Sequence, residues 1–254
     1  MRSIDFFDRQ FPVRTVFSEL EDHRRHEDWR DDEARTAILE DFLRTPLNRV
    51  IPPRETHSGN IRLVTGEQPE GSLAYTDERF SIKGPGGHDS IVTDVPGVLI
   101  HLWTADCLPL YLYDPVRHAA AMVHNGWRGA CGGITVNTLR VMRERFGTDS
   151  RDVAAAIGPC ICGSCYEVGE ELLQPFRKHF GRDEAERFFT PGNAGKYYLD
   201  VRKAVCSDLA KAGVRAERIC DIGICSFEDH AFASYRRDGI YPHGEQTLSG
   251  IVLL

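Results

Sequence analysis

Cys107 and His124 are the residues of the stretch TADCLPLYLYDPVRHAAAMVHNGWRG (104–129) whose side chains could do chemistry together. A thiol beside an imidazole can act as nucleophile and base, and the same two groups can bind one transition-metal ion. The alternative is that both are packed core residues, because buried cysteines and hydrogen-bonded histidines are common in protein interiors. Which of these holds depends on whether the chain between them folds back on itself.

The residues between them predict a β-hairpin. The sequence DPVR favours a four-residue turn, which places Tyr113 opposite His118 and, at the same register, Cys107 opposite His124. Facing side chains lie on one side of a sheet with Cβ atoms about 5 Å apart. Pro109 cannot donate a ladder hydrogen bond, and a bulge there would change this register. Alternation predicts a core face (Leu108, Leu110, Leu112, Ala119, Ala121, Val123) and a face where a cleft could lie (Cys107, Tyr111, Tyr113, His118, Met122, His124).

The residues HNGWRG, directly after the second strand, have the composition of a ligand loop. Gly126 and Gly129 let the backbone turn tightly and approach a ligand. Trp127 offers a stacking face, and Arg128 offers a cationic fork for phosphate or carboxylate. The alternative for Trp127 is that it covers the core.

Composition predicts one large α/β domain in the cytoplasm. The 254 residues, 41% hydrophobic, are enough for a large core. The net charge of −7, without a run of five Lys or Arg, argues against nucleic acid and anionic membranes as partners. Without a signal-peptide pattern or a membrane-length apolar run, the eight cysteines are expected as thiols.

The order of apolar runs and helical patterns predicts a mixed β-sheet flanked by helices. The glycine-rich stretch 82–89 lacks the spacing of a phosphate-binding loop and is predicted to be a plain connection. Helices are predicted over 19–45 (an amphipathic surface helix), 131–146, 167–180 and 200–212, and strands over 60–64, 98–103, 108–114, 119–124, 153–158 and 218–225.

Five motifs, taken in order, resemble one family. TADCLPLYLYDP, VHNGWRG, IGPCICGSCYEVG, YYLDV and SYRRDG are similar to the laccase-domain proteins, also called multicopper polyphenol oxidoreductases, peptidoglycan editing factors and, more recently, purine nucleoside phosphorylases. The resemblance covers 55–239 of a single domain, 1–254, and leaves 1–50 as a variable segment. It implies a layered α/β/β/α fold like that of the cytotoxic necrotizing factors.

The resemblance implies a metal site. The family's ligands are the histidine of Gln-x-His, the cysteine of Ala-Asp-Cys and the histidine of His-Ala-Gly-Trp-Arg-Gly, which fall on His57, Cys107 and His124. Glu55 stands in place of the glutamine and Asn125 in place of the alanine. Two nitrogens and one sulfur with a free fourth position suit catalytic zinc, with copper as the alternative metal. A laccase usually pairs histidines as His-x-His, and this sequence has no such pair.

The resemblance also implies the activity, a zinc-dependent purine nucleoside phosphorylase acting on adenosine, inosine or methylthioadenosine, with adenosine deamination as a second reaction. The partners would be the nucleoside and phosphate, and a homodimer is the assembly considered. Cys107, His124 and Arg128 would be catalytic, and Arg128, Trp127 and Arg236 would bind substrate.

Two other functions remain open. Cys107 and His124 could form a metal-free cysteine amidase that edits a peptidoglycan precursor, although strand alternation points Asp106 away from them. The chain could also be a non-catalytic zinc-binding or nucleoside-binding protein.

A second group of cysteines, Cys160, Cys162 and Cys165, raises the question of a structural zinc site. Such a site needs another Cys pair or a His at matching spacing, and the stretch 218–225 offers only Cys220 and Cys225. These cysteines are therefore expected to be reduced thiols.

Overall fold

The structure is a computed structural model that describes residues 1–26, 29, 31–68, 71–77, 79, 86–193, 195–239 and 246–254. Of the predicted connection at 82–89, residues 82–85 lie outside this set. Within the described residues, no helix combines the length and the apolar character needed to cross a bilayer.

Among the described residues, the largest sheet has seven strands and contains the predicted hairpin. Its strands lie in the order β13-β9-β7-β8-β5-β3-β4. The β13–β9 and β5–β3 pairs are parallel and the others antiparallel, so the prediction of a mixed sheet is confirmed. The strands are β3 (Ile61–Val64), β4 (Ser72–Tyr75), β5 (Ser90–Thr93), β7 (Leu108–Asp114), β8 (Ala119–Asn125), β9 (Ala154–Ile157) and β13 (Ile219–Asp221).

The part of the chain that the structure describes forms two smaller sheets as well. The four-stranded sheet, in the order β1-β14-β6-β2, consists of β1 (Val13–Phe17), β14 (Thr247–Leu253), β6 (Val98–Thr104) and β2 (Arg49–Ile51). The three-stranded sheet, in the order β10-β12-β11, consists of β10 (Glu167–Gly169), β12 (Lys196–Leu199) and β11 (Phe189–Pro191).

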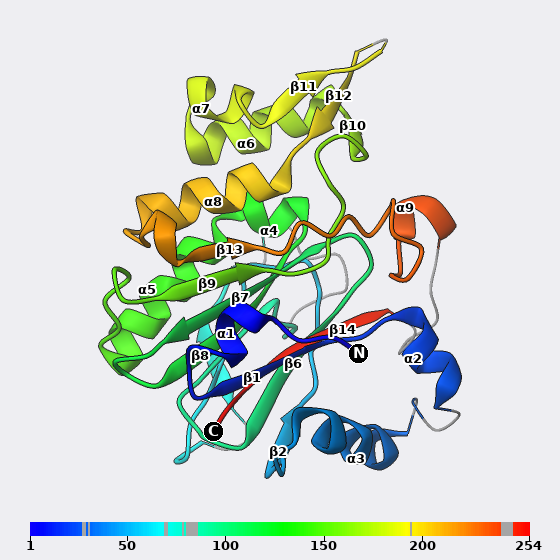
Figure 1. Ribbon diagram of the computed structural model, residues 1–254. Coiled ribbons are helices and arrows are strands. Elements are labelled where there is room, and N and C mark those ends of the chain that lie inside the picture. Colours follow the sequence, from blue (N-terminus) through cyan, green and yellow to red (C-terminus); the bar gives the residue numbers. More distant parts are fainter. Residues whose placement is uncertain are drawn as a thin grey trace.

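Helices cover the outer faces, which confirms the predicted layered α/β class (Figure 1). The helices are α1 (Asp5–Asp8), α2 (Leu20–Arg25), α3 (Asp32–Leu43), α4 (Trp127–Gly132), α5 (Ile134–Phe146), α6 (Leu173–Phe180), α7 (Arg182–Glu186), α8 (Val201–Lys211) and α9 (Tyr235–Asp238). The first core cluster joins the seven-stranded sheet to α5, α6 and α8. The second lies between the two large sheets, and the third joins the four-stranded sheet to α3.

The hairpin has a different register from the predicted one. Asp114 pairs with Ala119 and Pro109 with His124, so the turn is shifted by one residue and the register by two. The cause lies in the turn, where the Asp114 carboxylate accepts two backbone N–H groups and His118 adopts a left-handed φ of 51°. A shift of two preserves which side chains share a face. Tyr113 therefore faces Ala120, not His118.

The second face of the hairpin is not a cleft along its length. Tyr111, Tyr113 and Met122 are fully buried in the core between the two sheets. That part of the prediction is wrong, because the four-stranded sheet covers this face. The leucines of the other face lie in the first core cluster, as predicted.

Several predicted elements differ in their bounds. The helix predicted over 131–146 is two helices that meet at Gly133, whose φ is 76°. Over 167–180 the first three residues are strand β10, and α6 begins only at Leu173. Of the strand predicted over 218–225, Ile219–Asp221 forms β13, and Cys225 forms an isolated bridge with Cys160. The described residues of the segment 19–45 form two helices, with Leu39 and Leu43 buried against the four-stranded sheet.

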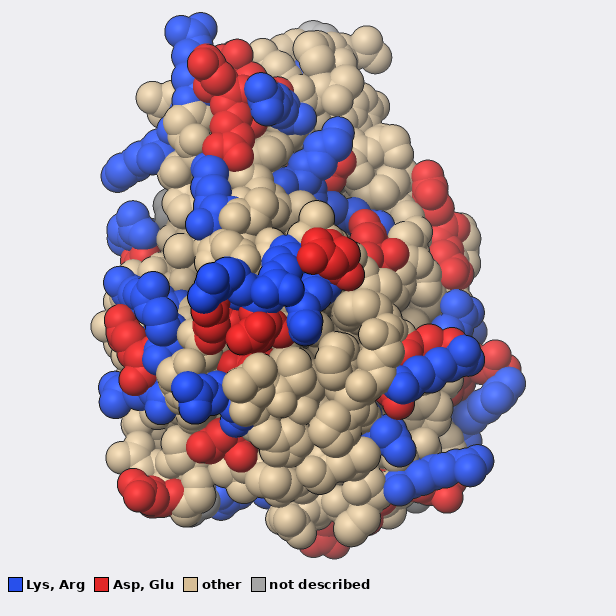
Figure 2. All heavy atoms as spheres, turned by 60° about the vertical axis from the view of Figure 1, so that its left-hand side comes forward, with Lys and Arg blue, Asp and Glu red and all other residues tan. Residues whose placement is uncertain are grey.

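Lys and Arg side chains are interspersed with Asp and Glu over the face shown in Figure 2. Exposed pairs such as Arg151 with Asp149 and Arg182 with Glu186 are of this kind. Exposed ion pairs contribute little to stability, so the cores carry most of the folding free energy.

Candidate active site and metal centre

His57, Cys107 and His124 come together at one end of the layer between the two large sheets. One ring nitrogen of each histidine and the Cys107 sulfur lie within 4.8 Å of one another. His124 is near the end of β8, Cys107 directly precedes β7, and His57 lies between β2 and β3. Cys107 is not opposite His124 in the ladder. It reaches the same face because it is two residues before Pro109, the actual partner of His124.

Asp89 organises this group, and sequence reasoning missed it. It directly precedes β5, which pairs with β8 on the side away from β7. The Nδ1–H of His124 donates to Asp89 Oδ1 at 2.7 Å, and the backbone N–H of His124 donates to the Asp89 carbonyl at 2.7 Å. With Nδ1 carrying the hydrogen, His124 Nε2 has its lone pair free for a metal.

The same carboxylate holds the chain around His57. Backbone N–H groups of Thr56, His57 and Ser58 donate to its two oxygens at 3.1, 2.9 and 2.7 Å. His57 has a φ of 58°, a left-handed conformation that is uncommon for a residue with a side chain. Asp89 thus compensates a strained turn that presents the His57 ring, and strain of this kind often marks functional sites.

Electrostatics favour an ionised Asp89. Burial acts to raise its pKa, but the hydrogen bond and charge of His124, with hydrogen bonds from Ser58 and Thr56, lower it to about 2. Burial likewise acts to raise the pKa of Cys107, yet His124 and His57 lower it to about 6. The Cys107 thiolate and Asp89 in turn raise the pKa of His124 against the effect of burial. Without a metal, Cys107 and His124 therefore form a thiolate–imidazolium pair.

The donor set fits a zinc ion. Tetrahedral ligands at ordinary zinc distances are about 3.5 Å apart, within the 4.8 Å limit that the three residues satisfy. The Nδ1 atom of His57 is buried and has no hydrogen-bond partner among the described residues. A Cβ atom at Gly126 would lie 3.1 Å from Cys107 Sγ and 3.2 Å from His57 Cδ2. A side chain at position 126 would therefore press on two of the three ligands.

A pocket of about 450 Å³ opens above the three ligands. Of the residues predicted to bind substrate, Trp127, Arg128 and Arg236 all line it. Arg128 lies 4.3 Å from the Trp127 ring centroid, and Arg236 lies 5.0 Å from that of Tyr166, which also lines the pocket. Trp127 also packs against the first core cluster, so its position is compatible with either of its predicted roles. The pocket thus places two guanidinium groups on its wall.

The two arginines of SYRRDG have different surroundings. Arg236 reaches the pocket wall, with its Nη1 donating to the Glu167 carbonyl at 2.6 Å. The Arg237 guanidinium donates to the carbonyls of Ser226, Phe227 and Phe232. Arg237 therefore stabilises a loop.

Asp106 connects the Cys107 turn to the same loop. Its φ is 86°, and its carboxylate accepts the Ser226 hydroxyl and the Arg236 N–H, each at 2.7 Å. Strand alternation predicted that Asp106 points away from His124. Residue 106 precedes β7, however, so the direction of its side chain follows from these hydrogen bonds and not from alternation. Asp106 thus serves the site by orienting the segment that carries Arg236.

Both departures from the family pattern lie on the pocket wall. Glu55 accepts the backbone N–H of Trp103 at 2.7 Å, a bond that a glutamine oxygen could also accept. Asn125 is fully buried, and its Oδ1 accepts the Thr135 hydroxyl at 3.0 Å. Its Nδ2 has no hydrogen-bond partner in the part of the chain that the structure describes.

All eight cysteines are free. Cys160 is buried beside the pocket, whereas Cys162 and Cys165 gather with Cys225 and with Glu228. Of the two cysteines in the stretch 218–225, Cys225 joins this group and Cys220 does not. The fourth member, Glu228, is a carboxylate that a pattern of cysteines and histidines does not include.

Comparisons with known proteins agree with the motifs. A protein named purine nucleoside phosphorylase from Bacteroides thetaiotaomicron is 33% identical over 219 residues, covering 86% of this chain and 78% of that protein. Adenosine deaminase RL5, from an unknown prokaryotic organism, is 33% identical over 211 residues, covering 82% and 77%. The crystal structure of YlmD from Geobacillus stearothermophilus matches with a TM-score of 0.73 and 29% identity, covering 89% of this chain and 81% of that one. The family described as multi-copper polyphenol oxidoreductase laccase matches residues 10–252, and this chain belongs to it.

Proposed function

We propose that this protein is a zinc-dependent purine nucleoside phosphorylase. The observation that carries the proposal is the His57–Cys107–His124 group at the base of a pocket whose wall bears Arg128 and Arg236. A relative named purine nucleoside phosphorylase, 33% identical to this chain, supports the reaction class. The substrates would be phosphate and a purine nucleoside such as adenosine, inosine or methylthioadenosine.

Different residues of the pocket would bind phosphate, stack on the purine and orient the metal ligand His124. Arg128 and Arg236 bind phosphate, since guanidinium groups match phosphate oxygens in charge and geometry. Trp127 and Tyr166 offer aromatic faces on which a purine can stack. Asp89 holds the proton on His124 Nδ1, which keeps Nε2 directed at the metal position. A bound zinc would act as a Lewis acid on an oxygen of the reactants.

Phosphate-dependent release of free base tests the proposal. Zinc-loaded protein should release adenine or hypoxanthine from the three nucleosides only when phosphate is present. Cys107→Ala should lose this activity together with the zinc ion held by His57, Cys107 and His124. Cys206→Ala removes a half-buried cysteine outside the pocket and serves as the matched control. If fully zinc-loaded protein releases no base from any of the three, the phosphorylase proposal is wrong.

Adenosine deamination is proposed as a second reaction of the same pocket. A relative carries the name adenosine deaminase and is also 33% identical. Adenosine supplied without phosphate should then become inosine, and the conversion can be followed by chromatography. Loss of this reaction in Cys107→Ala would assign it to the same ligands.

A metal-free cysteine hydrolase is the second candidate, and one observation favours it. Cys107, His124 and Asp89 form a nucleophile, a base and an orienting carboxylate, with Asp89 in the position that Asp106 does not fill. Metal analysis separates the two proposals. A zinc ion bound by His57, Cys107 and His124 and lost in Cys107→Ala supports the phosphorylase. Active protein without metal in this group, inactivated by iodoacetamide at Cys107, supports the hydrolase.

A further inference from the structure

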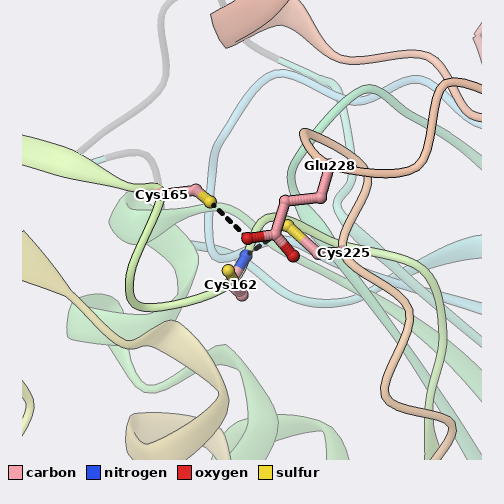
Figure 3. Close-up of side chains that lie close together, drawn as sticks. All are labelled: Cys162, Cys165, Cys225 and Glu228. Carbon is pink, nitrogen blue, oxygen red and sulfur yellow. Dashed lines mark hydrogen bonds between the residues drawn. The ribbon is translucent and has the colours of Figure 1, made fainter.

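We propose that Cys162, Cys165, Cys225 and Glu228 bind a second zinc ion, in a structural site separate from the pocket ligands. The three sulfurs and a Glu228 carboxylate oxygen lie within 4.8 Å of one another. Figure 3 shows the four side chains converging from two separate loops. Three thiolates with one carboxylate form a closed set of four ligands, as structural zinc sites require.

The spacing of the ligands suits a zinc site. Cys162 and Cys165 are three residues apart, and so are Cys225 and Glu228. A pair at this spacing lets one tight turn present two ligand atoms on the same side. Two such turns, one from each loop, face each other here. The second turn ends in glutamate, so a search for paired cysteines does not detect it.

The first turn is formed without a metal. The N–H groups of Cys165 and Tyr166 both donate to the Cys162 carbonyl at 3.1 Å. The N–H of Cys162 donates to Cys225 Sγ at 3.3 Å, and Cys165 Sγ lies 3.3 Å from Glu228 Oε1. These bonds hold the first turn and place its two sulfurs beside the Cys225 sulfur and the Glu228 carboxylate.

The second turn is held by independent contacts. Cys225 forms a parallel bridge with Cys160, and its carbonyl accepts the Asp229 N–H at 2.9 Å. Arg237 donates to the carbonyls of Ser226 and Phe227, which lie between the two ligands. Because both turns are anchored, a zinc ion would find its ligands in place and lose little conformational entropy on binding.

Membership of the cluster is selective. Cys160 is two residues from Cys162 and Cys220 is five residues from Cys225, yet neither belongs to the group. Cys225 is buried, whereas Cys162 and Cys165 are partly exposed and Glu228 is exposed, so an ion can enter from solvent. Cys220 thus provides a control cysteine on the same segment of the chain.

The second site would fix one wall of the pocket. Tyr166 follows Cys165 directly and lines the pocket, and Arg236 donates to the carbonyl of the next residue, Glu167. A metal clamp between the two loops would therefore hold the Tyr166 ring and the Arg236 guanidinium together. This consequence for substrate binding rests on the proposed function, whereas zinc binding itself does not.

Metal content in a background without the first site tests the proposal. Cys107→Ala protein, purified with a thiol-free reductant, should retain about one zinc ion per chain, and Cys107→Ala with Cys225→Ser should retain none. Cobalt added to stripped Cys107→Ala protein should produce an intense thiolate-to-cobalt absorption that Cys225→Ser abolishes. Cys107→Ala with Cys220→Ser should match Cys107→Ala in both measurements.

Glu228→Gln addresses the case in which Cys225→Ser does not fold, because Glu228 is exposed. In the Cys107→Ala background this variant should stay folded and bind cobalt more weakly, with a shifted absorption spectrum. Cys107→Ala protein without zinc or a cobalt–thiolate band would overturn the proposal, as would a band unchanged by both substitutions. These results do not depend on activity, so they are distinct from failure of the proposed phosphorylase.

Discussion

Replacing Asp89 with asparagine should destabilise the fold and weaken the metal site together. Oδ2 accepts the N–H groups of Thr56 and Ser58, and Oδ1 accepts those of His57 and His124 Nδ1. An amide has one oxygen, so its NH2 group must face one of these two pairs of donors. Each buried donor left without an acceptor costs about 1–3 kcal/mol.

The two orientations of the amide have different consequences. With the NH2 group toward Thr56 and Ser58, two backbone donors lose their acceptor, and the free energy of unfolding falls by about 2–6 kcal/mol. With the NH2 group toward His124, the imidazole must accept at Nδ1 and carry its hydrogen on Nε2, which prevents metal binding there. The zinc affinity of the His57–Cys107–His124 site should then fall at least about 10–100-fold, as for other losses of a carboxylate that orients a metal ligand.

Urea unfolding and competition with a chromogenic chelator measure the two effects. Asp208→Asn is the matched control, because Asp208 is also buried and contacts a histidine, His179, at 2.9 Å but lies outside the pocket. It should alter stability without changing zinc affinity. If Asp89→Asn keeps its zinc affinity and unfolds within about 0.5 kcal/mol of wild type, the inferred role of Asp89 is wrong.

The lowered pKa of Asp89 predicts how the difference in unfolding free energy between wild type and Asp89→Asn depends on pH. Asp89 titrates near 2 in the folded protein and near 4 in the unfolded chain, so its ionised form contributes stability above about pH 4. That contribution is lost as the pH falls toward 2. The stability gap between wild type and Asp89→Asn should therefore be constant near neutrality and shrink in acid.

Three further predictions concern the residues around Asp89 and the pocket. Gly126→Ala places a Cβ 3.1 Å from Cys107 Sγ and should lower zinc affinity about ten-fold by chelator competition, whereas Gly66→Ala, with open space around its Cβ, should not. In zinc-stripped protein, iodoacetamide should alkylate Cys107 with a midpoint near pH 6, because the thiolate predominates above its lowered pKa; a midpoint near that of a free thiol would contradict the ion pair. Arg237→Ala should lower the free energy of unfolding, measured in urea, by about 2–3 kcal/mol. Arg236→Ala should mainly raise the KM for phosphate. Equal effects of the two substitutions on this KM would contradict the assignment of Arg236 to the pocket and of Arg237 to the loop.

The parts of the site that were predictable from sequence are those encoded locally. Strand alternation between Cys107 and His124 placed both on one face, and a register shifted by two residues left that result intact. The register itself was not predictable from turn propensity, because the Asp114 carboxylate and the left-handed His118 move the four-residue turn one position along the chain. His57 came only from the family motif, since no local pattern distinguishes a histidine in an irregular segment.

Asp89 and Glu228 were not predicted from the sequence, because each meets its partner through a contact between distant parts of the chain. Asp89 meets His124 because β5 pairs with β8, a contact between residues 35 positions apart. Its local signal, a carboxylate just before a fully buried strand, could have marked it as a residue with a partner. Glu228 is 63 residues from Cys165, and its only signal is the three-residue spacing from Cys225.

The two ligand groups depend on each other through the chain segments that hold them. Asp106 precedes Cys107, and its carboxylate binds Ser226, which follows the second-site ligand Cys225. The same carboxylate binds the N–H of Arg236, so one side chain connects the first metal position, the second cluster and a pocket cation. Asp89 independently fixes His124 and the His57 turn. Disorder in the second cluster should therefore displace Arg236 before it disturbs those histidines, affecting phosphate binding before zinc binding.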